Sequence, residues 1–299
     1  MNNQLRNLKR ASPANIASDA SMKNLSKSSA LIISELKSLA HEALEVGILD
    51  MQDNKVRYLH DKILMCLDSA SHSDAISIMQ SDEVQELRST LIRLNADLHK
   101  TTEIALAQRF LSEDDSGDPF VDSWINKGFT NLLNSQIDQW QDASILDDVK
   151  KGPIVVVGGG ALPQTQVFLH RSLGCEVISV DIDEQSATLC TEVLRKMGLT
   201  HTSVICADAK SFNFERASIV VVATLVRQKA EIAAQVAKTA PDAYFAPRTP
   251  VKLHAMWREL VCVEELSAKG WQSISVLTPP ESSVASMLFS YSATREPPI

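Results

Sequence analysis

Hydrophobic positions along the chain follow two different periods. From Ser29 to about Trp140 they recur every three or four residues, the spacing of amphipathic helices, and after Pro153 they gather in short β-branched runs. The helical spacing predicts helices over residues 30–49, 56–67, 83–110 and 120–140. Residues 1–28 are polar and show no period, which predicts a disordered or loosely held tail.

The second half of the chain alternates short apolar runs with helical segments. Strands are expected at residues 154–157, 176–180, 203–206, 219–222, 244–246, 274–277 and 287–291. Strands separated by helices indicate a parallel sheet with right-handed crossovers, and the last two strands lie close enough together for one to run antiparallel. We therefore predict an α/β protein with a seven-stranded, mostly parallel sheet. An all-helical domain is expected at 29–147 and a Rossmann-like domain at 148–299.

Composition narrows the range of partners. The 299 residues carry a net charge of −8, which argues against nucleic acid because phosphate binding relies on clustered lysine and arginine. No apolar run reaches the roughly 18–20 residues that cross a bilayer, and the N-terminal segment lacks the apolar core of a secretory signal. A cytoplasmic protein that acts on a small molecule is expected, with no membrane partner. A homodimer is compatible with the sequence.

The cysteines give no sign of a framework or a metal site. They are five in number, scattered, and without a C-x-x-C pair, which argues against disulfides and against structural zinc. Buried free thiols are expected instead. Since the sequence shows no other cluster of metal ligands, no metal is expected.

The most informative stretch is IVVVGGGALPQT at residues 154–165. An apolar strand runs directly into Gly158, Gly159 and Gly160, and a helical pattern follows from Gln164. Glycines permit a tight turn and the close approach of a ligand, and the first N–H groups of the next helix can face a polar group. Nicotinamide, flavin and S-adenosylmethionine enzymes all use such a loop. Because Pro163 stands about where a dinucleotide fingerprint has its third glycine, the pattern favours S-adenosylmethionine (SAM) over NAD.

Two acidic residues follow at the ends of later strands. Asp181 closes the run EVISVD, where a carboxylate can accept hydrogen bonds from both ribose hydroxyls of a nucleoside. Asp208 follows the third strand, where an adenine amino group could be read. A helix N-cap is the alternative role for an aspartate in such a position. Together the two acids favour a nucleoside site.

Four segments, in order along the chain, resemble the nicotianamine synthase family, including its bacterial branch that makes staphylopine- and pseudopaline-type opine metallophores. GGGALPQT at 158–165 is similar to that family's G-[SG]-G-x-L-P-x-T, and VDIDEQSATL at 180–189 to its D-I-D-x-x-A segment. ATLV at 223–226 resembles its A-x-L-V, and Arg248-Thr249 resembles its R-[ST]. The resemblance covers the second half of the chain well and the helical half loosely.

The resemblance implies a Rossmann-like class I SAM-binding fold and a distinctive reaction. Members transfer the 3-amino-3-carboxypropyl (aminobutyrate) group of SAM to an amine and release methylthioadenosine, and bacterial members add one unit to histidine. An amino acid, histidine first, is therefore the expected acceptor. The resemblance together with the acidic positions gives the residues expected to contact SAM: Gly158, Gly159, Gly160, Leu162, Pro163, Asp181, Ile182, Asp208, Ala209, Thr224 and Leu225.

The expected base comes from the third helix. LIRLNADLHKTTE at 91–103 resembles the family's L-I-x-L-C-G-x-A-E-G-x-L-E helix and aligns Glu103 with its last glutamate. Asn95, His99 and Glu103 recur every four residues and share one helix face. The resemblance makes Glu103 the catalytic candidate, with His99 as a second and Asn95 as a substrate contact. A solvated helix face is the alternative.

Arginines supply the candidates for a substrate carboxylate. Arg248, followed by Thr249, lies just past the carboxyl end of a strand, where ligands of α/β proteins gather. Arg227 replaces the glycine that usually follows A-x-L-V, and it could pair with a substrate carboxylate or face solvent. The family's tyrosine in the helix before the sheet has no counterpart, since Gly128 or Phe129 stands in the matching region. Glu103 is therefore expected to act alone or through water.

Two other functions fit the same features. A small-molecule methyltransferase would use the same core but release S-adenosylhomocysteine. A catalytically inactive SAM-binding module would bind the nucleoside without turnover. For the leading function, the helical domain is expected to cover the site and exclude water.

Overall fold

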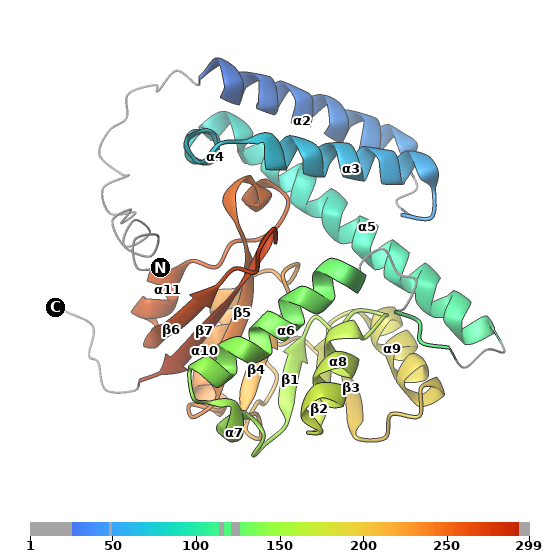
Figure 1. Cartoon of the computed structure of the whole chain (residues 1–299), viewed down its shortest axis with the longest axis vertical. Coiled ribbons are helices and arrows are strands. Elements are labelled where there is room, and N and C mark those ends of the chain that lie inside the picture. Colours follow the sequence, from blue (N-terminus) through green and yellow to red (C-terminus); the bar gives the residue numbers. More distant parts are fainter. Residues whose placement is uncertain (1–25, 48–49, 114–116, 121–125, 293–299) are drawn as a thin grey trace.

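The computed structural model describes residues 26–47, 50–113, 117–120 and 126–292, and the statements below concern those residues. A group of helices lies above a mixed sheet that has further helices on its faces (Figure 1). Most of the tail expected at 1–28 lies outside the described residues. Ser26 caps the first described helix, so residues 26–28 form its start.

The helices are α2 (Lys27–Val46), α3 (Asn54–Ser69), α4 (His72–Met79), α5 (Gln85–Ser112), α6 (Asn126–Asp142), α7 (Leu146–Val149), α8 (Gln164–Leu173), α9 (Glu184–Lys196), α10 (Lys229–Thr239) and α11 (Val263–Ala268), with the 3-10 helices η2 (Asp82–Val84) and η3 (Lys252–Met256). The strands are β1 (Ile154–Val157), β2 (Val177–Asp181), β3 (Thr202–Cys206), β4 (Ile219–Val222), β5 (Tyr244–Pro250), β6 (Trp271–Leu277) and β7 (Val284–Tyr291). The predicted α/β class is confirmed.

The sheet has the order β3-β2-β1-β4-β5-β7-β6. Strands β1 to β5 pair in parallel, whereas β7 runs antiparallel to both of its neighbours, β5 and β6. The prediction of six parallel strands and one antiparallel strand is confirmed. The order of the strands reverses between β1 and β4, since β2 and β3 lie on one side of β1, and β4 and β5 lie on the other. Ligands of open α/β sheets bind at such a reversal.

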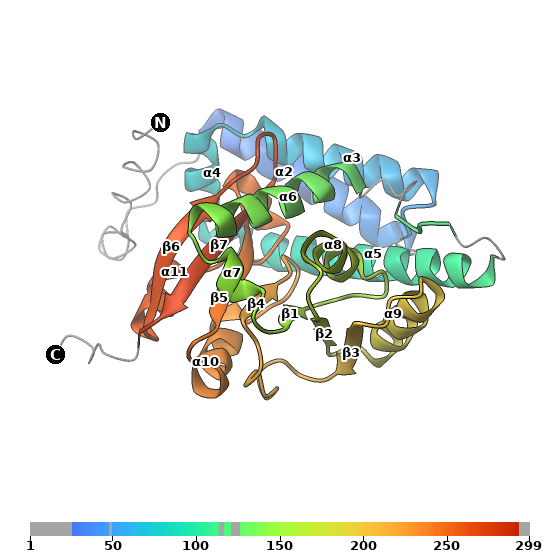
Figure 2. The ribbon, with the colours of Figure 1, turned by 60° about the horizontal axis from the view of Figure 1, so that its bottom comes forward.

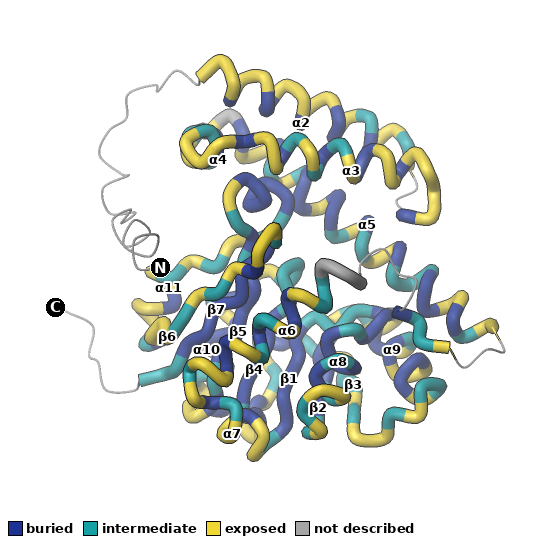
Figure 3. The backbone as a smooth tube through the Cα atoms, in the orientation of Figure 1, coloured by how far each residue is buried: buried dark blue, intermediate teal, exposed yellow. Residues whose placement is uncertain are grey.

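The central strands are buried on both sides, as their unbroken apolar sequences require (Figure 3). Ile154 and Val156 of β1 pack with Trp140 and Val149 from α6 and α7. Val155 and Val157 face the other side, in the cluster that includes α10. Packing therefore crosses the domain boundary expected at residue 147, because α6 and α7 belong to the sheet layer.

The N-terminal helices build a core of their own. Asp53 and Ser71 cap α3 and α4 by accepting hydrogen bonds from backbone N–H groups of the first turn. The short helix α4 was not predicted, because its eight residues hold only two buried positions, Ala75 and Ile78. No described helix is long and apolar enough to cross a membrane.

Two connections join this helical core to the sheet layer. The first is α5, whose 28 residues cross both layers (Figures 1 and 2). Leu91 and Leu98 lie in the helical core, whereas Leu106 and Phe110 pack with Leu162, directly after the glycine loop. The second is η3, which follows β5. Leu253 and Met256 of η3 and the following Trp257 are buried among the N-terminal helices.

Candidate active site

The glycine loop lies at the point where the order of the strands in the sheet reverses. It follows β1, which lies between β2 and β4. Gly158 and Gly160 adopt φ values of 80° and 68°, the left-handed region in which a Cβ is strained. A Cβ at Gly158 would also collide with the Val226 side chain, and one at Gly160 with the Glu103 carboxylate. The segment that follows β4 and helix α5 both lie against the loop, so a side chain at Gly158 or Gly160 would not fit.

Asp181 ends β2 beside this loop. Its Oδ2 accepts a hydrogen bond from the Gly160 N–H at 2.9 Å, and its Oδ1 accepts from the Asp183 N–H at 3.0 Å. A carboxylate oxygen has two lone-pair sites, so each oxygen can accept one more hydrogen bond. The cap of α9 is Asp183, whose side chain accepts from the Ser186 N–H. Asp181 is thus not an N-cap, and its geometry fits a ribose.

Glu103 reaches the loop from α5. The backbone N–H groups of Ala161 and Leu162 donate to its carboxylate. Surrounding protein raises the pKa of Glu103 to about 8, mainly by desolvation and next by the nearby charge of Asp181, against the opposing effect of the two N–H donors. Part of the side chain remains accessible. A carboxyl group with this pKa can exchange a proton near neutral pH, which suits a general base.

The other two residues of the predicted helix face point to a different neighbour. Asn95 is fully buried, and its Nδ2 donates to the Trp257 carbonyl at 2.9 Å. His99 is half-buried, and its pKa is lowered to about 3 by burial and by the charges of Arg258 and His60. His99 is neutral at physiological pH. Helix α5 therefore faces two places in succession, the segment around Arg258 and then the glycine loop.

The remaining residues expected to contact SAM differ in how far they are exposed. Ile182 is 71% exposed beside Asp181, and Asp208 is half-exposed, with its Oδ1 accepting from the Lys210 N–H at 2.9 Å. Ala209 is buried in the cluster beneath β4. Leu162 and Pro163 are buried, whereas Gly159, Thr224 and Leu225 are partly exposed. The structure brings the loop, Asp181, Ile182 and the 223–226 connection to one edge of the sheet.

Arg248 is a buried guanidinium held by neutral groups. Its Nη1 donates to Thr165 Oγ1 at 3.2 Å and its Nη2 to Gln136 Oε1 at 3.0 Å, while the Phe129 ring lies 5.2 Å away, centroid to guanidinium carbon. Its Nε has no partner among the described residues. Burial lowers the pKa of Arg248 to about 10, so it remains charged. No carboxylate of the described chain lies within 4.0 Å, which leaves it able to bind an anionic ligand group.

The two residues predicted alongside Arg248 are placed elsewhere. Thr249 Oγ1 accepts a hydrogen bond from the Val261 N–H at 3.1 Å, a contact on the α11 side of the sheet. Neighbouring residues of a strand point to opposite faces, so Thr249 and Arg248 do not share a site. Arg227 is exposed at the entry to α10.

A buried lysine that the sequence did not single out fixes the loop after β4. Lys229 Nζ donates to the carbonyls of Val226 at 2.7 Å, Thr224 at 3.1 Å and Glu259 at 3.3 Å. Desolvation lowers its pKa to about 8. Lys229 thereby ties the 223–226 segment, which touches Gly158, to the segment that carries Arg258. Its position at the start of an ordinary helical pattern gave no signal.

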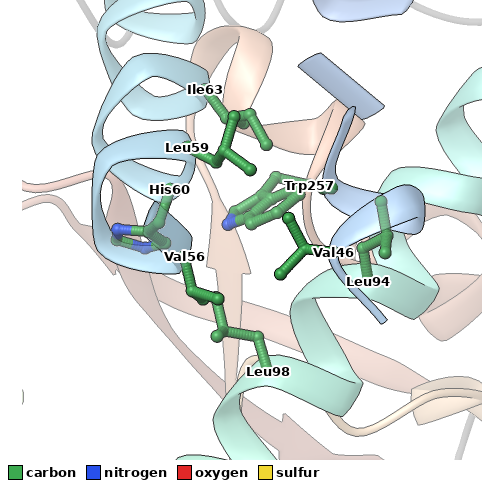
Figure 4. A pocket seen from close by; sticks show the side chains of 9 residues that line it. Val46, Val56, Leu59, His60, Ile63, Leu94, Leu98 and Trp257 are labelled. Carbon is green, nitrogen blue, oxygen red and sulfur yellow. The ribbon is translucent and has the colours of Figure 1, made fainter. Parts of the chain in front are cut away.

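A small apolar pocket lies within the helical core, apart from the glycine loop. It is lined by Ala43, Val46, Val56, Leu59, His60, Ile63, Leu94, Leu98 and Trp257 (Figure 4). The Trp257 and His60 rings are 6.3 Å apart, centroid to centroid, and Figure 4 shows the indole nitrogen on the side of α3. The aliphatic lining does not suit a charged substrate. Among the described residues, no group of three or more His, Cys, Asp or Glu could hold a metal ion.

Comparisons with known proteins find the resemblance expected from the motifs. No family model matches the chain. The L-histidine 2-aminobutanoyltransferases of Pseudomonas aeruginosa strains UCBPP-PA14 and PAO1 are each 31% identical to this chain over 108 residues, which is 36% of the chain and 40% of the relative. The matched region therefore spans about 40% of the length of these curated relatives.

Solved structures extend the similarity of fold over most of the chain. MtNAS, a nicotianamine synthase, in complex with MTA and tNA gives a TM-score of 0.75 at 19% identity, covering 87% of this chain and 97% of that one. A glutamate-to-glutamine variant of MtNAS in complex with S-adenosylmethionine gives 0.73 at 20% identity with the same coverage. At this identity the comparison establishes the fold, including the helical N-terminal region.

Proposed function

We propose that this protein transfers the aminobutyrate group of SAM to the amine of an amino acid, with L-histidine as the acceptor, and releases methylthioadenosine. The observation that carries the proposal is the contact of Glu103 with the glycine loop beside Asp181. A proton acceptor from the helical layer thus meets a nucleoside-binding edge of the sheet. The names of the relatives support the same reaction.

The residues at this edge fit SAM. A side chain at Gly158 or Gly160 would fill the loop, and Asp181 keeps acceptor capacity on both oxygens. Asp208 is available for the adenine amino group, and Arg248 for the carboxylate of the donor arm. When bound, the sulfonium of SAM activates its three attached carbons toward displacement, so the carbon that faces the amine decides the product. The nearby charge of Asp181 helps to raise the pKa of Glu103, and a cationic donor bound beside both groups would lower that pKa and favour the carboxylate form that accepts a proton.

Glu103 has the properties that the acceptor side requires. An amine attacks only when a lone pair is free, so its proton must be removed. Glu103 can accept that proton and, because part of its side chain is accessible, pass it on to solvent. Since the phenolic group of a tyrosine is absent at Phe129, this route uses the carboxylate alone or with water. The α5 helix holds Glu103 in place from both layers, and cover by the helical layer limits competing hydrolysis.

The destination of the product forms a further part of the proposal. Histidine extended by one aminobutyrate unit carries imidazole, amine and carboxylate groups, which are suitable ligands for divalent transition metals. This chemistry supports a role in the synthesis of an opine-type metallophore. We place the reaction in the cytoplasm on the grounds of sequence composition and include a homodimer as the oligomeric state to be tested.

The by-product decides between the candidate functions. Purified protein is incubated with SAM and L-histidine, and the products are separated and identified by mass spectrometry. The proposal requires methylthioadenosine and histidine enlarged by one aminobutyrate unit. Formation of S-adenosylhomocysteine and methylated histidine would show that the protein is a methyltransferase instead. SAM binding without turnover across a panel of amino acids would indicate an inactive binding module.

A further inference from the structure

A second desolvated arginine lies in the segment after η3, which packs on the helical layer. Arg258 directly follows Trp257 and is half-buried. Its Nη1 donates to Ser283 Oγ at 3.0 Å, a neutral partner. Burial lowers its pKa to about 10, so the guanidinium remains charged. No described carboxylate lies within the 4.0 Å of an ion pair.

The groups around Arg258 leave this positive charge uncompensated at short range. His99 is neutral, and burial lowers the pKa of His60 as well. The carboxylate charge that acts on Arg258 is that of Asp68, and this carboxylate is hydrogen-bonded to His254 Nε2 at 2.8 Å rather than to Arg258. A desolvated guanidinium without an anion is costly, and its planar fork of donors matches a carboxylate.

The backbone around Arg258 is held rigidly from both sides. On one side, Asn95 Nδ2 donates to the Trp257 carbonyl at 2.9 Å, and Trp257 is buried in the helical core. On the other side, Lys229 Nζ donates to the Glu259 carbonyl and to the loop that touches Gly158. This bracing connects Arg258 to both the α5 face and the glycine loop.

The α5 helix sets the spacing between Arg258 and the expected base. His99, whose pKa is lowered by the charge of Arg258, is one turn before Glu103, a rise of about 6 Å along the helix. An α-amino acid carries its amine and carboxylate on one carbon, so the two groups lie close together. A carboxylate bound near His99 would bring the amine toward Glu103.

We infer that Arg258 binds the α-carboxylate of the acceptor amino acid and so orients the α-amine toward Glu103. This assignment rests on the proposed function. The reaction brings together two substrates that each carry a carboxylate, and the described chain has two desolvated arginines without ion pairs. Arg248 contacts Thr165 at the start of α8, next to the glycine loop, and takes the donor arm. Arg258 faces the helical layer and takes the acceptor.

The test compares two acceptors that differ by one group. L-histidine and histamine share the imidazole and an amine, but histamine has no carboxylate. Methylthioadenosine release is measured over a range of each acceptor for the wild type, for Arg258→Gln and Arg258→Lys, and for the exposed control Arg93→Gln on α5. Binding of SAM to each protein is measured separately by calorimetry.

For the wild type, kcat/KM for L-histidine is expected to exceed that for histamine at least tenfold, the range of a charge-assisted hydrogen bond. Arg258→Gln should raise KM for L-histidine at least tenfold and bring the ratio of kcat/KM for L-histidine to that for histamine close to one. The dissociation constant for SAM should stay within about threefold of the wild-type value. Arg258→Lys should recover part of the preference, and Arg93→Gln should match the wild type.

Each result has a distinct meaning. Wild-type turnover with equal use of both acceptors overturns the role of Arg258, even if the Gln variant fails to fold. An unchanged preference in Arg258→Gln overturns it as well. A parallel loss with L-histidine and histamine would show a purely structural arginine. Absence of methylthioadenosine from the wild type with any amino acid would instead refute the proposed function.

Discussion

The ionisation of Glu103 should destabilise the fold as the pH rises. Its pKa of about 8 in the folded protein exceeds its usual value of 4.5, so the folded state retains a proton that the unfolded chain loses. Stability is therefore lost progressively between these two values and levels off above pH 8. Glu103→Gln keeps an acceptor oxygen for the Ala161 and Leu162 N–H groups and carries no charge at any pH.

The expected gain follows from the pKa difference. Each pKa unit corresponds to about 1.4 kcal/mol, so the rise from 4.5 to about 8 sets an upper bound of about 5 kcal/mol. Because the Glu103 side chain is partly accessible, solvent screens a share of this energy, and about 2 kcal/mol is expected. For a chain of this size, that corresponds to a rise in Tm of roughly 4 °C.

The assay is thermal unfolding of the ligand-free protein at pH 5 and pH 9. Glu103→Gln should have nearly the wild-type Tm at pH 5 and a higher Tm at pH 9. Glu86→Gln, which changes an exposed glutamate of the same helix, serves as the matched control and should differ little between the two pH values. Equal Tm shifts for Glu103→Gln at both pH values would refute the burial and charge assigned to this carboxyl group. Turnover should be lost in the same variant while SAM affinity changes little.

Three further changes test the site. Gly158→Ala should lower stability by at least ~1 kcal/mol, measured by denaturant unfolding, because the φ of 80° and the Val226 side chain both oppose a Cβ; adding Val226→Ala should recover only the steric part, and full recovery would contradict the strain. Asp181→Asn should weaken SAM binding at least tenfold by calorimetry, and an unchanged dissociation constant would remove its ribose role. Lys229→Met should cost about 1–3 kcal/mol in the same unfolding assay, because three carbonyls lose a donor; wild-type stability would show that the loop does not depend on it.

The parts of the fold that were predictable are those with a local period. The β1 and β4 runs are apolar throughout because both faces of these strands are covered, and their bounds match the prediction. Gly158 and Asp181 were also identifiable, since a turn and a strand end leave signals in the adjacent sequence. The prediction for α6 was incomplete because it, too, rested on local sequence alone. Its apolar stripe shows that one face is buried, but a stripe does not specify whether a sheet or a helix covers it.

Long-range partners account for most of what the sequence did not reveal. Arg258 and Lys229 lie in unremarkable local patterns, and their chemistry depends on what other segments bring to them. The spacing of Asn95, His99 and Glu103 correctly placed them on one side of α5, but it could not show that the first two face the Trp257–Arg258 segment and the third the glycine loop.

This division of the α5 face explains why the helical layer is integral to the site rather than only its cover. Asn95 fixes the peptide before Arg258, and Glu103 meets the loop at Gly160, so one rigid helix sets the distance between the expected carboxylate anchor and the expected base. Trp257, buried among the N-terminal helices, packs the η3 segment into the same core as that helix. Any shift of the helical layer would therefore move both acceptor contacts together relative to Asp181. In the proposed reaction, the position of the amine relative to the donor therefore depends on how α5 packs on the sheet layer, where Leu106 and Phe110 pack with Leu162 beside the glycine loop.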